Sequence, residues 1–266
     1  MAQPAEKKVF EQTKGLTEIP MRYCPGCGHG IAHRLVGEVI EELGVRQRSV
    51  AVVPVGCSVF LDEYVNCDGI QGPHGRGPAI ATGIKRSSTE TIVFSYQGDG
   101  DLASIGMAET IHSAARSENI TIIFINNAIY GMTGGQMAPT TLVGMRATTC
   151  PSGRSIEVNG YPFHMCELLA TLPGASYLAR TSLDKPANIV KTKKAITKAF
   201  KTQIEGKGFS MVEILSPCPT DWGMTPLEAI ERLQKEMIPY YPLGVYRDWE
   251  AEEKAEAKKE KETVEA

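Results

Sequence analysis

Two apolar segments, each followed at once by an oxygen-bearing side chain, constrain this chain more than any other feature. The first, residues 91–96, leads into a Gly-Asp-Gly turn that contains Asp99, and the second, residues 120–125, leads into an Asn-Asn pair that contains Asn127. Residues 102–116 between them repeat apolar side chains at helical spacing. A strand–helix–strand unit brings the ends of parallel strands to one edge of a sheet, so we expect the two oxygen-bearing side chains to meet there.

Such a meeting point suits a hard cation together with an anion. Magnesium prefers oxygen ligands in octahedral geometry and often shares them with phosphates, so Asp99 and Asn127 are candidate ligands. Gly98 and Gly100 allow the backbone to approach a diphosphate, and the helix that follows offers its N-terminus to the anion. The spacing resembles the thiamine diphosphate signature, although two ordinary strand-to-helix turns would leave the same pattern.

Apolar strands and amphipathic helices alternate over most of the chain. This alternation predicts an α/β fold with a doubly wound, mostly parallel sheet, and the apolar run over residues 120–125 suits the centre of that sheet. Further strands are expected at residues 49–55, 176–180 and 209–215, and further helices at residues 31–43, 78–85, 163–172, 186–203 and 225–237.

Changes of composition divide the chain into segments. Residues 131–160, rich in Thr, Gly, Met and Pro, form a long loop of a kind that is usually functional or bound to a partner. The last segment is an Ala/Glu/Lys run, which we expect to be a solvated and frayed helix. The expected organisation is a flexible N-terminal arm over 1–17, a thiamine diphosphate-binding α/β domain over 18–216, a C-terminal helical extension over 217–249 that carries the last cysteine, and a charged tail over 250–266.

Charge and targeting signals argue against several classes of protein. The net charge is −3 and the pI is near 6.0, which argues against nucleic-acid binding. No apolar run is long enough to cross a bilayer, and no basic stretch followed by an apolar core marks a signal peptide. We therefore expect a cytoplasmic protein without a membrane partner, in which the seven cysteines are metal-binding or free rather than disulfide-bonded.

Four of the cysteines lie where they could converge. Cys24 and Cys27 form a Cys-Pro-Gly-Cys turn, Cys57 ends an expected strand, and Cys218 follows the last strand. Four thiolates at one sheet edge would suit zinc or an iron–sulfur cluster about equally. A thioredoxin-like redox pair is a weaker alternative, because that motif normally follows a first strand and opens a helix. The other cysteines have no comparable spacing and are expected to be buried or incidental thiols: Cys67, Cys150 and Cys166.

Seven short motifs occur in a fixed order along the chain. They are Cys24-Pro25-Gly26-Cys27-Gly28-His29-Gly30, Val55-Gly56-Cys57-Ser58, His74-Gly75-Arg76, Gly98-Asp99-Gly100-Asp101, Asn126-Asn127, Tyr130-Gly131-Met132-Thr133-Gly134-Gly135-Gln136 and Ser216-Pro217-Cys218-Pro219. Together, over roughly residues 23–244, they resemble the beta subunit of the 2-oxoacid:ferredoxin oxidoreductases. Residues 220–226 and 240–244 look most like the multi-subunit 2-oxoglutarate type.

The resemblance implies ligands for two inorganic groups and a coenzyme. A [4Fe–4S] cluster would be held by the four cysteines, and the resemblance, rather than their spacing, decides against zinc. Mg²⁺ would be held by the side chains of Asp99 and Asn127 and by the backbone carbonyl of Ile129. The cluster ligands would be Cys24, Cys27, Cys57 and Cys218, and thiamine diphosphate would contact Val55, Gly56, Cys57, Ser58, His74, Arg76, Gly98, Gly100, Asp101, Asn127, Gly131 and Thr133.

Three residues are candidates for catalytic roles by the same resemblance. His74 would lie at the diphosphate or near the substrate, although a histidine in a glycine-rich loop is often only a hydrogen-bonding residue. Met132 and Thr133 would lie near the thiazolium ring, with loop packing as the alternative. Arg76 would contact phosphate or form a structural ion pair.

The implied reaction is the reversible oxidative decarboxylation of a 2-oxoacid with coenzyme A to acyl-coenzyme A and carbon dioxide, with electrons passing through the cluster to ferredoxin. The expected substrate is 2-oxoglutarate, with 2-oxoisovalerate or pyruvate as alternatives, and a non-enzymatic Cys₄ zinc scaffold is a different class. The chain has no second α/β unit for the pyrimidine ring, so an alpha subunit is expected to supply the glutamate there. We expect the chain to be inactive alone and to assemble with gamma-type and delta-type subunits as well.

Overall fold

A seven-stranded sheet forms the centre of the molecule, in a computed structural model that describes residues 11–264. All neighbouring strands are parallel except β5 and β7, which are antiparallel. The doubly wound, mostly parallel sheet expected from the sequence is confirmed. In spatial order the strands are β2 (Asp68–Gln71), β1 (Ser49–Val53), β3 (Ile92–Gly98), β4 (Thr121–Asn126), β6 (Phe209–Leu215), β5 (Ala175–Ser182) and β7 (Gly244–Asp248).

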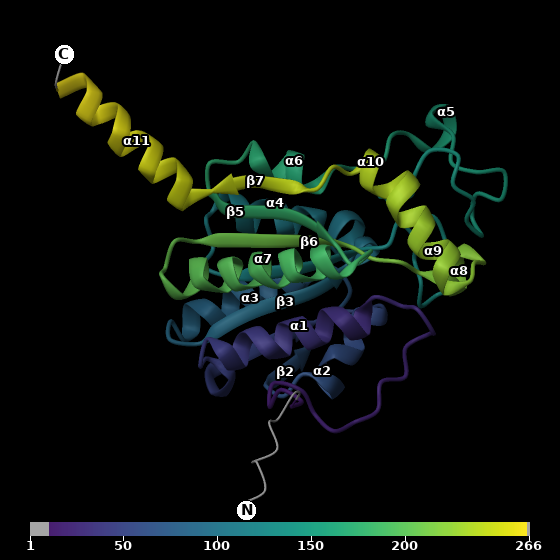
Figure 1. Cartoon of the computed structure of the whole chain (residues 1–266), viewed down its shortest axis with the longest axis horizontal. Helices are drawn as coiled ribbons and strands as arrows, with labels where there is room; N and C mark the ends of the chain where they lie inside the picture. Colours follow the sequence, from purple (N-terminus) through teal and green to yellow (C-terminus); the bar gives the residue numbers. More distant parts are fainter. Residues whose placement is uncertain (1–10, 265–266) are drawn as a thin grey trace, which may run out of the picture.

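Helices cover both faces of this sheet (Figure 1). Helices α1 (His29–Glu42) and α7 (Pro186–Ile204) share one buried core with the strands. Helices α3 (Gly77–Ser87), α4 (Met107–Ala115) and α6 (Met165–Ala170) share the core on the opposite face. The remaining short helices are η1 (Arg46–Arg48), η2 (Cys57–Phe60), α2 (Leu61–Tyr64) and α5 (Ile156–Asn159).

Strand β4 shows why the sequence at the centre is an apolar run. Ile123 and Ile125 lie in the core with α1 and α7, whereas Ile122 and Phe124 lie in the core with α3, α4 and α6. Successive side chains of a strand point to opposite faces, so a strand covered on both faces needs apolar residues at every position. Every residue of β4 is buried.

A third buried cluster joins the C-terminal extension to the loop after β4. The extension contains α8 (Pro219–Trp222), α9 (Pro226–Arg232), a π-helical turn (Leu233–Met237) and α10 (Ile238–Tyr240). Helix α9 begins at a capping box, in which Thr225 Oγ1 accepts from the Glu228 N–H and the Glu228 carboxylate accepts from the Thr225 N–H. The extension therefore lies at the edge of the sheet where β4 and β6 end.

The helix expected over 102–116 is interrupted near its start. A π-helical turn (Asp101–Ile105) precedes α4, with Gly106 between the two. A Cβ at Gly106 would lie 2.5 Å from the Asp101 carbonyl oxygen and 2.6 Å from the Gly75 carbonyl oxygen. The glycine is required because the loop that carries His74 packs directly against the start of the helix.

Two edge strands, β2 and β7, lie outside the strands expected from the sequence. Both are short, β2 is exposed throughout and β7 is only partly buried. An edge strand has one unpaired side and little buried surface, so it carries no apolar run that periodicity could detect.

The N-terminal arm is packed onto the domain where the structure describes it. The Thr17 N–H donates to the Tyr64 carbonyl (2.9 Å), and the Asn66 N–H donates to the Gly15 carbonyl (2.8 Å). A Cβ at Gly15 would lie 2.0 Å from the Gly37 carbonyl oxygen. Residues 13–17 thus differ from the flexible arm expected over 1–17, because backbone contacts hold them in place; residues 1–10 lie outside the described part.

The charged tail forms α11 (Trp249–Val264), which projects from the body (Figure 1). Its start is anchored on α7, because Trp249 Nε1 donates to Thr202 Oγ1 (3.2 Å) and Lys207 Nζ lies 4.1 Å from the centroid of the Trp249 ring. Residues 251–255 are exposed, as expected for a solvated helix. Within residues 11–264 no helix has the length and apolar character to cross a membrane.

Candidate functional site

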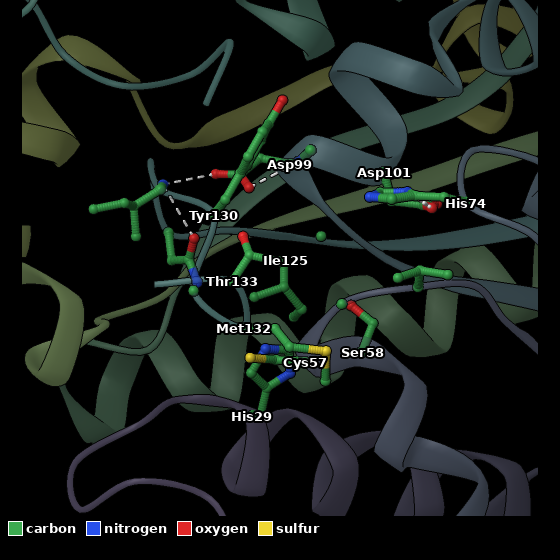
Figure 2. A pocket seen from close by; sticks show the side chains of 17 residues that line it. His29, Cys57, Ser58, His74, Asp99, Asp101, Ile125, Tyr130, Met132 and Thr133 are labelled. Carbon is green, nitrogen blue, oxygen red and sulfur yellow. Dashed lines mark hydrogen bonds and ion pairs between the residues drawn. The ribbon is translucent and has the colours of Figure 1, made fainter. Parts of the chain in front are cut away.

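A hollow lies where β1, β3 and β4 end (Figure 2). It encloses about 660 Å³, including the open space at its mouth. The structure brings together here nearly all residues that the sequence assigned to the coenzyme, to magnesium or to catalysis. They are Val55, Gly56, Cys57, Ser58, His74, Gly98, Asp99, Gly100, Asp101, Asn127, Ile129, Gly131, Met132 and Thr133.

Asp99 is the most constrained of these residues. It is 3% exposed, and its carboxylate accepts hydrogen bonds from Thr140 Oγ1 (2.8 Å), the Gly100 N–H (2.9 Å) and the Ile129 N–H (3.1 Å). Burial raises the pKa of Asp99 to about 7, and these hydrogen bonds oppose the rise. No basic side chain forms an ion pair with Asp99 in the part of the chain that is described, so the site contains a buried carboxylate without a counter-ion.

Asn127 is brought to the same place by a strained turn. The Asn126 carboxamide oxygen accepts from the Ala128 N–H (3.1 Å), and Ala128 takes a left-handed φ of 59°. The Ile129 N–H donates to Asn127 Oδ1 (3.3 Å) as well as to Asp99, so the two oxygens share one donor. We call Asp99, Asn127 and the Ile129 carbonyl the oxygen side. Magnesium prefers oxygen ligands, and the oxygen atoms of these three residues fit that ion.

Glycines open the wall of the hollow to a ligand. Gly56 has a φ of 117°, which strongly favours glycine, and a Cβ there would meet no atom within 4 Å. At Gly100 a Cβ would lie 2.4 Å from the Tyr130 ring, so a side chain here would displace that ring. The backbone is therefore accessible at Gly56, which fits a diphosphate held by N–H groups, whereas Gly100 is buried beneath the Tyr130 ring.

His74 is held by a buried carboxylate. Its Nδ1 lies 2.6 Å from Asp101 Oδ1, which also accepts from the Gly75 N–H (2.6 Å), while the Gln97 side-chain amide donates to the other oxygen. Burial raises the pKa of Asp101, and the hydrogen bonds oppose this. The Asp101 side chain is thus occupied, so it could offer a diphosphate only its backbone, whereas His74 faces the hollow beside it (Figure 2).

Arg76 lies outside the lining of the hollow. Its guanidinium forms an ion pair with Glu109 of α4, and the arginine side chain is about half exposed. Of the two roles considered for Arg76, the geometry favours the structural ion pair over the phosphate contact.

The four candidate cluster cysteines gather beside the hollow; we call them the cysteine side. A Cβ built on Gly131 would lie 3.5 Å from Cys57 Sγ and 3.6 Å from Cys218 Sγ, so these sulfurs are at most about 7 Å apart. The turn between Cys24 and Cys27 packs on the extension, since a Cβ at Gly26 would lie 2.7 Å from the Pro226 side chain and 3.2 Å from that of Pro219.

Backbone N–H groups point at two of these sulfurs. The His29 N–H donates to the Cys27 thiol and the Asp221 N–H to the Cys218 thiol, and each bond lowers the pKa of its cysteine. Burial outweighs this effect and raises the pKa of Cys27 to about 11. Burial also raises the pKa of Cys57 to about 11, and the Cys27 thiol adds to the rise. Buried thiols of this kind are unreactive, and a metal that bound them would displace their protons.

No three His, Cys, Asp or Glu side chains within residues 11–264 are placed to hold a single metal ion. A mononuclear zinc site would need its sulfurs within about 2.3 Å of one point. Ligands of an iron–sulfur cluster surround a group several atoms wide and stand further apart. The upper limit of about 7 Å between Cys57 Sγ and Cys218 Sγ is compatible with both groups.

Three residues at the site were not assigned a function from the sequence. His29 and Tyr130 also line the hollow, and Thr140 donates to Asp99 from the long loop. Two of these residues could have been found from the sequence. His29 lies two residues after Cys27, and Tyr130 lies beside Gly131. Nothing in the sequence marks Thr140, since the loop reaches Asp99 only through the fold.

The other cysteines lie apart from this site. Cys150 and Cys166 are buried, and Cys67 is partly buried. Cys166 belongs to the core with α3, α4 and α6, which agrees with an incidental buried thiol.

Comparisons with known proteins find relatives along the chain. Residues 54–214 match the family model described as thiamine pyrophosphate enzyme, C-terminal TPP binding domain. The ketoisovalerate oxidoreductase subunit VorA of Methanothermobacter marburgensis is 49% identical over 245 residues, which cover 92% of this chain and 51% of that protein. The 2-oxoglutarate synthase subunit KorB of Methanocaldococcus jannaschii is 41% identical over 206 residues, which cover 77% of this chain and 72% of that protein.

A solved structure has the same fold. It is a 2-oxoglutarate:ferredoxin oxidoreductase from Magnetococcus marinus with 2-oxoglutarate, coenzyme A and succinyl-CoA bound, which matches with a TM-score of 0.75 and 27% identity over 92% of this chain and 87% of that chain. The chain spans about half the length of the VorA relatives it matches.

Proposed function

The chain belongs to the thiamine pyrophosphate enzymes and, among them, to the beta subunits of the 2-oxoacid:ferredoxin oxidoreductases, and we propose that it provides the diphosphate-binding half of such an active site together with the first electron acceptor. The observation that carries this proposal is the position of Cys57. It lines the same hollow as Asp99 and Asn127, while its sulfur lies on the cysteine side. One strand end thus joins the coenzyme site to the cluster site.

In the proposed site, Asp99, Asn127 and the Ile129 carbonyl hold Mg²⁺, and the accessible backbone at Gly56 contributes to holding the diphosphate. When bound, thiamine diphosphate supplies the electron sink that makes decarboxylation of a 2-oxoacid possible. The protein keeps Asp99 in place through hydrogen bonds from buried groups, so no reorganisation of this carboxylate is needed when the ion arrives.

The other lining residues position the reactants and exclude water. His74, oriented by Asp101, presents a ring nitrogen to the hollow near the diphosphate site. Ile125 and Met132 provide an apolar wall, which strengthens electrostatic contacts by keeping water away. Thr133 is exposed and is bonded to the Gln136 side chain, so it would act only after the mouth is covered.

Four thiolates would hold a [4Fe–4S] cluster on the cysteine side: Cys24, Cys27, Cys57 and Cys218. The cluster would accept electrons singly from the neighbouring coenzyme and pass them to ferredoxin. The short path through Cys57 favours this transfer.

A partner subunit completes the proposed site. The hollow is open, and at its rim Val55 and Met132 are each 42% exposed, which is unusual for apolar side chains beside an active site. No glutamate lines the hollow within residues 11–264, so the glutamate that acts on the pyrimidine ring would come from an alpha subunit. Gamma-type and delta-type subunits and a ferredoxin would be the other partners, with coenzyme A as co-substrate.

For the substrate we favour a 2-oxoacid with an uncharged side chain, such as 2-oxoisovalerate, over 2-oxoglutarate. No Lys or Arg lines the hollow in the described part of the chain, so this subunit offers no partner for a second carboxylate. The 49% identity to a ketoisovalerate subunit and 41% to a 2-oxoglutarate subunit points the same way. The 2-oxoglutarate expected from the sequence becomes the second candidate.

The test is purification of the chain with its co-expressed partner subunits, followed by assays for thiamine diphosphate, magnesium, iron and sulfide. We expect a brown complex that reduces ferredoxin when given a 2-oxoacid and coenzyme A, with 2-oxoisovalerate giving a higher kcat/KM than 2-oxoglutarate. A colourless complex that contains zinc would overturn the proposal in favour of a scaffold. Turnover by the lone chain would overturn the proposed need for an alpha subunit.

A further inference from the structure

Asp221 is an acidic residue that stands among the cysteines. Its Oδ2 accepts from the Cys218 thiol (3.2 Å), and it lies 3.3 Å from the Cβ position of Gly131. Cys57 Sγ and Cys218 Sγ lie 3.5 Å and 3.6 Å from that same position. The carboxylate and two candidate ligand sulfurs therefore surround one point.

The Asp221 carboxylate interacts electrostatically with the cysteine side. Its Oδ2 stands 3.2 Å from Cys218 Sγ, one of the sulfurs proposed to hold the cluster. A fixed negative charge at that distance disfavours any further negative charge on a group that this sulfur holds.

This charge is not neutralised by a neighbour. No ion pair of Asp221 is found among the residues that the structure describes. Arg232, from the same extension, stacks on the Trp222 ring (5.2 Å to the centroid) and pairs with Glu236.

Nor does the carboxylate serve the fold in an evident way. Trp222, the next residue, anchors α8 by donating from Nε1 to the Asn127 carbonyl (3.1 Å), and Thr225 caps α9. Over residues 11–264, the side-chain hydrogen bond found for Asp221 is the one from Cys218.

We propose that Asp221 is a positioning residue for electron transfer: its negative charge lowers the reduction potential of the cluster held by Cys24, Cys27, Cys57 and Cys218. This inference rests on the proposed function, because it requires that cluster. One-electron reduction adds one negative charge to the cluster, and the electron comes from the coenzyme and leaves to ferredoxin. A fixed carboxylate opposes that added charge, so the reduced cluster is a stronger electron donor.

The experiment is a potentiometric titration of the intact complex, followed by the electron paramagnetic resonance signal of the reduced cluster. In Asp221→Asn the shape and hydrogen-bond acceptor are kept and the charge is lost. We expect the ratio of reduced to oxidised cluster at a fixed potential to rise about tenfold, which corresponds to about 59 mV for one electron. Asp221→Glu, which keeps the charge, should restore most of the wild-type value.

A matched control is Glu231→Gln, which removes an exposed carboxylate from the neighbouring helix α9, where it pairs with Lys235 (3.0 Å). Its potential should stay at the wild-type value. A wild-type potential in Asp221→Asn with full iron content overturns the inference while leaving the proposed function intact. If Asp221→Asn and Asp221→Ser both lose the cluster, Asp221 serves assembly and the inference is likewise overturned. Wild-type complex without iron overturns the proposed function itself.

Discussion

The oxygen side and the cysteine side meet at one hollow, but they are organised differently. On the oxygen side, Asp99 is almost fully buried and is fixed by three hydrogen bonds before any ion is present. On the cysteine side, Cys24 is exposed, Cys27 and Cys57 are partly buried, and no three ligands share a single ion position within residues 11–264.

The difference is the one expected from the two groups proposed for this hollow. A single small ion needs its ligands placed around one point, so the fold places them in advance. A cluster several atoms wide supplies its own geometry, and its ligands need only lie around its edge. The cysteine side is instead supported from behind by neutral aromatic rings, since Tyr23 stacks on His29 with centroids 4.9 Å apart and donates to the Cys57 carbonyl (2.8 Å).

The largest expected effect is on the oxygen side. Asp99→Ala in the complex should weaken binding of thiamine diphosphate with Mg²⁺ by at least about 100-fold, because it removes a charged ligand from a buried site. Isothermal titration calorimetry measures this, with Asp68→Ala on the exposed strand β2 as the control. Iron content should not change. Equal loss of iron and coenzyme would show that the two sides are not independent.

The converse change tests the cysteine side. Cys218→Ser should remove most of the iron and the visible absorption and lower ferredoxin reduction at least about 100-fold, while thiamine diphosphate binding stays within about threefold. Cys166→Ser, at a buried thiol apart from this site, is the control and should keep its iron. Retained iron in Cys218→Ser would remove Cys218 from the ligand set.

The rigidity attributed to the oxygen side depends on Arg154. The Arg154 side chain is 4% exposed and anchors the loop that carries Thr140. Because Arg154→Met removes this anchor, it should lower the free energy of unfolding by about 3 kcal/mol and weaken coenzyme binding about tenfold. Chemical denaturation and calorimetry measure the two effects, and Arg146→Met, at an exposed arginine of the same loop, should show neither. The guanidinium donates to the carbonyls of Ala138, Pro139, Thr141, Asn159, Gly160 and Tyr161.

A smaller change isolates one bond of that arrangement. Thr140→Val removes the hydroxyl that donates to Asp99 Oδ2. Affinity for Mg²⁺ with thiamine diphosphate should therefore fall about fivefold, which corresponds to about 1 kcal/mol, the net contribution of a typical hydrogen bond. The control is Thr197→Val, at a partly buried threonine of α7. An unchanged affinity would mean that the backbone N–H groups alone keep the Asp99 carboxylate in position for the ion.

The support of the cysteine side should show in the pH dependence of stability. The ring of His33 packs edge to face on Tyr23, with centroids 5.3 Å apart. Burial lowers the pKa of His33 well below 6.5, so the folded chain keeps this ring neutral while the unfolded chain binds a proton below about pH 6.5. The free energy of unfolding should therefore fall as the pH drops below 6.5, and His33→Phe should reduce this slope by up to about 1.4 kcal/mol per pH unit.

Urea unfolding at pH 5.5 and 7.5 measures the slope for wild type and variant. His112→Asn, at an exposed histidine, is the control and should leave the slope unchanged. Part of the slope remains in His33→Phe, because burial also lowers the pKa of His29, to about 4. A slope that does not differ between wild type and His33→Phe would mean that His33 is protonated in the folded chain.

Much of the fold and of the oxygen side could be predicted from the sequence. Residues 120–125 are apolar at every position except Thr121, and such a run is typical of a strand covered on both faces, so the centre of the sheet could be identified. Asp99 and Asn127 follow two parallel strands directly, and parallel strands end at one edge, so their meeting is a consequence of local pattern.

Features that depend on contacts between distant segments could not be predicted in this way. The edge strands β2 and β7 have no apolar run, and the contact of Gly15 with Gly37 needs two backbones to meet. Thr140 reaches Asp99 through a loop whose course is set by Arg154, and sequence periodicity carries no information about such a course.

The sequence by itself determined the layered sheet, the strand ends that carry the candidate oxygen ligands, and the four candidate cluster cysteines. Each of these features is predicted by periodicity or residue spacing within a short segment. Only the tertiary structure decided that Thr140 reaches Asp99, that Arg76 pairs with Glu109, and that Asp221 stands among the thiols. These outcomes depend on the distances between segments far apart in the chain, and those distances are set when the helices and the extension pack onto the sheet.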